Sequence, residues 1–184
     1  MPDPRLKSFT DDKLVLLAKV AADTDSYGEL VRRHEQGLIA FLTKFCGSVT
    51  QAEDLAQNTL VKGFTHLHQF KGTSSFKTWL YRIGYREFLR DVRRSQSDAR
   101  LQEQIRQDIG TFTIKDPSQM MDISQALEAL KPQERSSIVL CDIFGFTHKE
   151  AARIQKLPLG TVKSHVKRGR AKVGQLLEVE IADE

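Results

Sequence analysis

The sequence predicts an all-α protein built as two small helical domains joined by a flexible linker. Apolar residues recur at three- and four-residue steps over most of the chain, which is the spacing of one buried helix face. We find no convincing run of the apolar–polar alternation that marks a strand. Residues 95–119 are polar and poor in large apolar side chains, so we expect them to link domains at 10–94 and 120–177.

In the first domain the pattern predicts helices over 11–21, 27–45, 51–67 and 76–94. Gly47 follows the longest apolar stripe and suits a helix end, because glycine adopts the left-handed conformation easily. The side chains expected to face inward from the third helix are Leu55, Ala56, Leu60, Phe64 and Leu67. A glycine- and serine-containing loop then precedes the fourth helix.

In the second domain the pattern predicts helices over 122–130, 132–143, 147–155 and 159–177. Thr147 is a candidate N-cap, and the small Ala151 and Ala152 permit a close helix crossing. One face of the last helix is apolar: Val162, Val166, Gly169, Val173 and Leu176. Two helices joined by a tight turn are typical of a helix-turn-helix, whose second helix enters the DNA major groove.

The outward face of the last helix has the chemistry of a DNA-binding surface. Hydroxyl, imidazole and cationic groups can contact both base edges and phosphates. The plain alternative is a helical hairpin with a solvated basic face; the small residues at the crossing and the absence of acids from 151–177 favour DNA binding. The candidate contacts are Thr161, Lys163, Ser164, His165, Lys167, Arg168 and Arg170.

A second basic region lies in the first domain. Residues 71–100 hold eight basic and three acidic side chains. Four arginines, Arg82, Arg86, Arg90 and Arg93, follow one another at helical spacing, with Trp79 one turn earlier. Aromatic rings beside a track of guanidinium groups suit splayed-out bases, so Tyr81, Tyr85 and Phe88 are candidates with Trp79. The alternative is that Trp79, Leu80, Ile83 and Phe88 simply fill the core.

Two segments carry a family resemblance. They read AEDLAQNTLVKGFTHLHQFKGTSSFKTWLYRI and LEALKPQERSSIVLCDIFGFTHKEAARIQKLPLGTVKSHVKRGRAKV. The first resembles the second conserved region of group IV (extracytoplasmic-function, ECF) sigma factors of bacterial RNA polymerase, and the second resembles their fourth region. The resemblance implies a region 2 helical bundle at 10–94 and a region 4 helix-turn-helix at 120–177, hence an alternative sigma factor that directs polymerase to promoters and assists strand opening.

The resemblance also implies roles for residues. The segment matching the polymerase clamp contact contains Glu53, Asp54, Leu55, Gln57 and Asn58. The segment matching the minus-ten contact contains Phe70, Lys71, Gly72, Thr73, Ser74, Ser75, Phe76, Trp79, Arg82, Arg86, Arg90 and Arg93. The helix-turn-helix matches the reader of the minus-thirty-five element. The implied partners are core polymerase, promoter DNA as duplex and as melted single strand, and a cognate anti-sigma factor.

Five positions depart from the family pattern. Asn58 and Leu60 stand where an acid and a phenylalanine are usual. Arg86 replaces a frequent asparagine and Arg90 a frequent aspartate, so the minus-ten preference cannot be copied from relatives. Lys156 replaces the common glycine of the turn between the two helices, where a positive φ would cost some energy.

Other function classes fit less well. TVKSH also resembles the recognition helix of LuxR-type regulators, so a free-standing helix-turn-helix regulator is the alternative, although the first domain shows no strands or phosphoacceptor pattern. We find no catalytic constellation and expect no enzyme activity, cofactor or metal; Glu53 and Asp54 are adjacent on a helix and point apart. No apolar run could span a bilayer or serve as a signal peptide, so we expect no membrane insertion and a cytoplasmic location.

Overall fold

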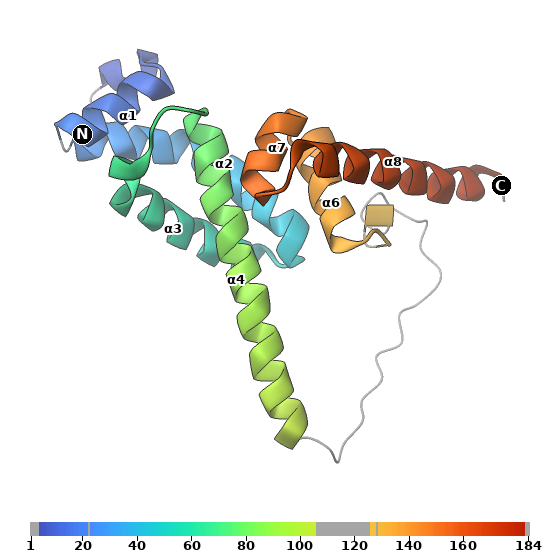
Figure 1. The fold of residues 1–184 in the computed structure, drawn as a ribbon. Helices are drawn as coiled ribbons and strands as arrows, with labels where there is room; N and C mark the ends of the chain where they lie inside the picture. Colours follow the sequence, from blue (N-terminus) through green and yellow to red (C-terminus); the bar gives the residue numbers. More distant parts are fainter. Residues whose placement is uncertain (1–3, 22, 106–125, 128, 183–184) are drawn as a thin grey trace. The chain divides into compact units, whose positions relative to one another are not determined.

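The computed structural model describes residues 4–21, 23–105, 126–127 and 129–182. Every regular element in these ranges is helical, which confirms the all-α prediction (Figure 1). The chain divides into two compact units, one built mainly on residues up to Arg90 and the other mainly on residues from Asp91 onward. None of the helices in the described ranges combines the length and the apolar content needed to cross a membrane.

Up to Arg90, the described part of the first unit holds six helical elements, the last of which continues beyond that residue. The N-caps of three of its helices, Thr10, Asp23 and Ser48, each accept a hydrogen bond from a backbone N–H of the first turn. Gly47 has φ 67° and closes the long second helix, as predicted. The elements are η1 (Pro4–Ser8), α1 (Asp11–Val20), α2 (Thr24–Cys46), α3 (Val49–Thr65), η2 (Leu67–Gln69) and α4 (Phe76–Ile105).

The core of the first unit forms where α2 packs against α1 and α3 and receives side chains from α4. Burying each large apolar side chain contributes about 1.5–3 kcal/mol. The largest fully buried side chains there are Leu14, Leu30, Leu38, Phe41, Leu42, Phe76, Leu80 and Tyr81. Phe64, predicted to face inward, is 45% exposed and contacts the Tyr27 ring with centroids 5.0 Å apart. It lies at the edge of the core.

Glycines allow these helices to approach closely. A Cβ on Gly63 of α3 would lie 2.6 Å from the Tyr27 hydroxyl of α2, which donates a 2.6 Å hydrogen bond to the carbonyl oxygen of Leu60. A Cβ on Gly84 of α4 would lie 3.1 Å from Leu38. Gly63 has no room for a side chain, and at Gly84 the Leu38 side chain would have to shift, so the two glycines let α3 and α4 lie directly against α2.

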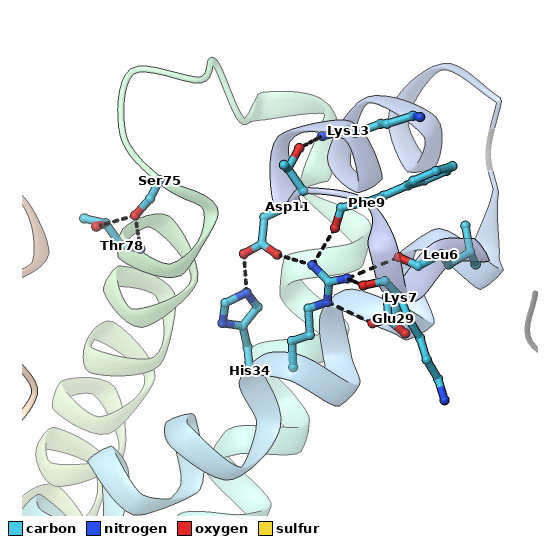
Figure 2. Close-up of polar contacts among 11 residues, drawn as sticks. Leu6, Lys7, Phe9, Asp11, Lys13, Glu29, His34, Ser75 and Thr78 are labelled. Atoms are coloured by element: carbon cyan, nitrogen blue, oxygen red, sulfur yellow. Dashed lines mark hydrogen bonds and ion pairs between the residues drawn. The ribbon is translucent and has the colours of Figure 1, made fainter. Parts of the chain in front are cut away.

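Arg33 of α2 fixes the N-terminal elements to the rest of the unit. Its Nε donates to Glu29, one terminal nitrogen donates to Asp11 and the carbonyl of Phe9, and the other donates to the carbonyls of Leu6 and Lys7. The Asp11 carboxylate also lies 2.6 Å from Nε2 of His34. Figure 2 shows Asp11 between His34 and the Arg33 guanidinium. One side chain therefore joins η1, the start of α1 and α2.

The fourth helix is longer than predicted. α4 continues to Ile105, past the predicted end at residue 94 and into the segment expected to be the linker. The added residues, SQSDARLQEQI, contain neither proline nor glycine and include several strong helix formers, so their propensity sustains the helix without an apolar stripe. The rest of the expected linker lies outside the described residues.

The second unit contains α6 (Pro132–Ile138), η3 (Val139–Ile143), α7 (His148–Gln155) and α8 (Leu159–Ala182). The predicted helix 132–143 is present, but its last five residues form a π-helical turn. Of the predicted helix 122–130, residues 126 and 127 are helical, whereas residues 122–125 and 128 lie outside the described residues.

The helix-turn-helix forms as predicted at the start of α7 and in the turn between α7 and α8. The Thr147 hydroxyl accepts from the backbone N–H of Glu150 at 3.3 Å, and the Glu150 carboxylate accepts from the Thr147 backbone N–H at 3.0 Å. This reciprocal pair is a capping box at the start of α7. Lys156, in the turn before α8, has φ 57° and is the one non-glycine with positive φ among the described residues.

α8 packs on α6 through its predicted apolar face. Val162 and Val166 are buried, whereas Val173 and Leu176 are half-buried. A Cβ on Gly169 would lie 2.7 Å from Cγ1 of Ile138, so the absence of a side chain sets the distance between α8 and α6. The opposite face of α8 is left exposed.

The contact at Gly63 gives a test of the first unit. Gly63→Ala should lower the free energy of unfolding by about 1–3 kcal/mol, because the new methyl displaces the rigid, hydrogen-bonded Tyr27 ring. Urea unfolding followed by the fluorescence of Trp79, the single tryptophan, reports on this unit.

Gly28→Ala is the matched control. Gly28 lies in α2, and apart from its chain neighbours and the nearby backbone of its own helix no described atom lies within 4 Å of the place that its Cβ would occupy, so alanine should raise stability by about 0.5–1 kcal/mol. Equal effects of the two substitutions would show that the close approach at Gly63 does not limit the packing.

Candidate nucleic-acid interface

The arginines of α4 form a cationic stripe in the first unit. Arg82 and Arg86 are half-buried, whereas Arg90 and Arg93 are exposed. Nε of Arg82 is buried without a hydrogen-bond partner among the described residues. Burial, and then the charge of Arg82, lower the pKa of Arg86. Neighbouring cations that destabilise each other's charge would be stabilised by a bound anion.

The aromatic residues around this stripe divide into two groups. Tyr81 and Tyr85 are 2% and 7% exposed, and burial raises the pKa of Tyr81 to about 12. Phe88 packs on Phe45, with ring centroids 5.3 Å apart. The interpretation of Tyr81 and Tyr85 as base-stacking platforms is therefore wrong, because both lie in the core. Trp79 is half-buried and lines the cleft between α3 and α4.

A cleft of about 400 Å³ lies between α3 and α4. Trp79 and Ile83 supply apolar surface; Glu87 pairs with Lys62 across the cleft and with Arg90 along α4. The sequence did not identify Lys62 or His66 as part of this surface, because they come from the previous helix. The lining residues are Lys62, His66, Gln69, Trp79, Ile83, Arg86, Glu87 and Arg90.

The loop before α4 is anchored at both ends by aromatic side chains. Phe70 and Phe76 are 5% and 1% exposed and contact each other and Trp79. Their side chains hold the loop in place and are not available to a ligand.

The part of the loop between Phe70 and Phe76 is largely exposed: Lys71, Gly72, Thr73 and Ser75 are exposed and Ser74 is half-buried, with φ 69° at Gly72. Ser75 Oγ accepts from the Thr78 backbone N–H at 3.1 Å and caps α4 (Figure 2).

α3 presents a mixed surface on its outer side. Glu53, Asp54, Gln57 and Asn58 are exposed, and no hydrogen bond or ion pair joins them to other described residues. Leu55, by contrast, is 8% exposed and belongs to the core. Two apolar residues that the sequence had not singled out as surface, Val61 at 63% and Phe64 at 45% exposure, extend the same side. Charged, amide and apolar groups together are typical of a protein-binding surface.

In the second unit, the exposed face of α8 carries the predicted recognition residues. Lys163, Ser164 and Lys167 are exposed, and Thr161 and His165 are half-buried. Ser164 Oγ donates to the Gly160 carbonyl at 2.9 Å, which leaves its lone pairs for another donor. Nδ1 of His165 is buried without a partner among the described residues. The N-terminal half of α8 therefore presents polar groups and unpaired lysines.

Three cations further along α8 are paired with acids of α6 and η3. Glu134 of α6 accepts from Nε of Arg168 at 3.0 Å and from Nζ of Lys172 at 2.7 Å. Asp142 of η3 accepts from two nitrogens of Arg170, at 3.0 and 2.5 Å. The hydrogen bond from Lys172, reinforced by that from Arg168 and opposed by burial, lowers the pKa of Glu134 to about 2.

Comparison with known proteins identifies both units. A model of sigma-70 region 2 matches residues 30–97, and a model of sigma-70 region 4 matches residues 120–173. The ECF RNA polymerase sigma factor EcfG of Rhodopseudomonas palustris is 31% identical over 169 residues, which cover 88% of this chain and 90% of the relative. The chain belongs to the ECF sigma factor family. It is therefore an alternative sigma factor.

Two further comparisons agree with this ECF assignment. The ECF sigma factor SigE of Mycolicibacterium smegmatis is 32% identical over 161 residues; the match covers 83% of this chain and 62% of that relative's length. The solved structure of the sigma factor RpoE of Bartonella quintana in complex with the anti-sigma factor NepR matches with a TM-score of 0.68 and 29% identity, over 83% of this chain and 97% of the solved chain. The first unit thus corresponds to region 2 and the second to region 4.

The low pKa of Glu134 predicts how the stability of region 4 depends on pH. In the folded state this pKa is about 2, below the usual 4.5, so the unfolded chain binds the proton more readily. The stabilisation is complete above pH 5 or so and is lost as the pH falls from about 4.5 toward 2.

Glu134→Gln should remove this part of the pH dependence. The stability difference between the wild type and the variant should be constant near neutral pH and shrink toward zero at pH 2 or so. Urea titrations followed by amide resonances of α6 and α8 measure it. A difference that stays the same at acid pH would contradict the assigned pKa.

Proposed function

We propose that this sigma factor binds bacterial core RNA polymerase in the cytoplasm, directs it to specific promoters and assists strand opening. The observation that carries the proposal is the pairing of two different cationic surfaces in one chain. Region 2 has an arginine-lined cleft with a half-buried tryptophan in its lining, and region 4 has a helix-turn-helix with a polar outer face. The first suits single strands and the second suits duplex DNA.

In region 2, the minus-ten element would bind along α4. The arginine stripe follows the phosphates, and Trp79 offers a stacking surface at the mouth of the cleft. The loop residues Lys71 to Ser75 contact the displaced strand, with Phe70 and Phe76 holding the loop from inside. This assigns contact roles to the loop between the two phenylalanines and an anchoring role to the phenylalanines themselves.

In region 4, the minus-thirty-five element would bind the exposed face of α8. Lys163 and Lys167 supply phosphate contacts, and Thr161, Ser164 and His165 supply groups that can read base edges. Arg170 is held by Asp142 through two hydrogen bonds, so its contribution to DNA binding is smaller than its position in the sequence indicates.

The energetics require a partner for strand opening. A bubble of about ten base pairs gives up stacking of roughly 1.4 kcal/mol per step, on the order of 14 kcal/mol in total. Two or three stacked bases return about 2–9 kcal/mol. The difference has to come from core polymerase, which also sets the spacing between the two DNA-binding units.

The exposed side of α3 is the proposed polymerase contact. Asp54, Gln57 and Asn58 lie on one face together with Val61, and their polar groups have no partners among the described residues. An exposed apolar side chain next to unpaired polar groups favours docking on another protein. A cognate anti-sigma factor is the proposed regulator, by analogy with the RpoE–NepR complex.

Asp54→Ala should weaken binding to core polymerase about five- to tenfold, because a truncated interface residue of this kind costs about 1 kcal/mol or more. Leu55→Ala is a poorer test, since Leu55 is buried and its loss disturbs the core. Binding is measured by titrating labelled polymerase with the full chain.

Asp25→Ala provides the control, since Asp25 is also an exposed aspartate on a helix of region 2 but lies on α2. It should bind polymerase as the wild type does. If both variants bind equally well, the α3 surface is not the polymerase contact.

A further inference from the structure

Arg168 and Arg170 lie two residues apart on α8, yet the structure holds them in different ways. Asp142 accepts from Nε and from one terminal nitrogen of Arg170, so one of the two edges through which that guanidinium can hold a pair of acceptors is occupied, and one of its terminal nitrogens is engaged. Glu134 accepts from Arg168 only through Nε, at 3.0 Å. Both terminal nitrogens of Arg168 are left without a partner among the described residues, and the side chain is 56% exposed.

The carboxylate that holds Arg168 is itself well fixed. Glu134 lies in the first turn of α6 and its side chain is 4% exposed. Its second oxygen accepts from Lys172, one turn further along α8. The contact between Gly169 and Ile138 sets the distance between the same two helices. The Arg168 guanidinium therefore rests on a rigid support. The pKa of Glu134 is lowered to about 2, because the contacts with Lys172 and Arg168 stabilise the charged carboxylate.

Arg168 also lies on the DNA-facing side of α8. It follows Ser164 by one helical turn and adjoins Lys167, both exposed. A guanidinium held through Nε presents its two terminal N–H groups as a fork, and this geometry matches two acceptors side by side. Guanine O6 and N7 form such a pair, and so do two phosphate oxygens.

We propose that Glu134 is a positioning residue for DNA recognition: it holds the Arg168 guanidinium so that both terminal nitrogens donate to one acceptor pair on the promoter duplex. This inference rests on the proposed function of region 4. Glu134 does not contact DNA and acts through Arg168. Arg170, held by two bonds to Asp142, serves the packing of α8 on the preceding segment.

The test measures binding of promoter fragments by the full chain assembled with core polymerase, at several salt concentrations. Glu134→Gln should weaken promoter binding about five- to tenfold, which is the lower end of the loss of affinity expected when one bidentate contact is lost. Charge alone predicts the opposite, because the variant removes a negative group close to DNA. In an Arg168→Ala background, Glu134→Gln should cause no further loss.

Asp142→Asn is the matched control. It removes the same charge and also breaks a carboxylate–arginine pair of α8, but its arginine is not the one presented to DNA. It should bind promoters as tightly as the wild type or more tightly. Arg168→Lys keeps both the positive charge and Glu134 but loses the planar fork, so it should weaken promoter binding as much as Glu134→Gln does. This variant tests the inference separately from any loss of stability that Glu134→Gln causes.

The two acceptor sources give different results for Arg168→Ala. Loss of discrimination at one guanine position identifies base edges, whereas an equal loss on all sequences, with the salt slope reduced by about 0.9, identifies phosphates.

Two results would overturn this inference alone. In the first, Glu134→Gln binds promoters as tightly as Asp142→Asn does. In the second, Glu134→Gln weakens binding by the same factor in the Arg168→Ala background as in the wild type. Failure of the wild-type chain to assemble with polymerase or to bind promoters would overturn the proposed function, and this inference with it.

Discussion

Close helix packing at glycine residues is the constraint on which both candidate surfaces depend. In region 2, Gly63 and Gly84 let α3 and α4 lie against α2, and this contact places the α3 side of the cleft beside the arginines of α4. In region 4, Gly169 brings α8 onto Ile138 of α6, close enough for Glu134 to reach Arg168. Each functional face is the outer side of a helix whose inner side has no room for a larger residue.

The second organising feature is the division of the cations into paired and unpaired groups. Arg33 makes five hydrogen bonds within region 2 and is a structural residue, although its side chain is of the same type as those of the arginine stripe on α4. In region 4, Lys163 and Lys167 have no partner among the described residues, whereas Arg170 is held by Asp142. Net charge therefore overstates the number of cations that a polyanion could contact.

Local features of the fold could be predicted from the sequence, and long-range ones could not. Gly47, the Thr147 cap and the positive φ of Lys156 follow from short-range backbone rules, and the apolar face of α8 follows from its periodicity. The spacing of Tyr81 places it beside the arginine stripe, but the sequence does not show that another helix packs over this side of α4 and buries the ring. The contacts of Glu134 with Arg168 and Lys172 span more than thirty residues, and no local pattern marks them.

The central claim is that two tethered DNA-binding units recognise a promoter together when core polymerase holds them. Run-off transcription by this chain and bacterial core polymerase, on a library of randomised promoters, tests that claim most directly. We expect transcripts from a defined set of templates that share two sequence elements at a fixed spacing, with neither element sufficient alone. Sequence-specific duplex binding by the chain without polymerase, and no template-dependent transcripts with it, would contradict the claim and indicate a free-standing helix-turn-helix regulator.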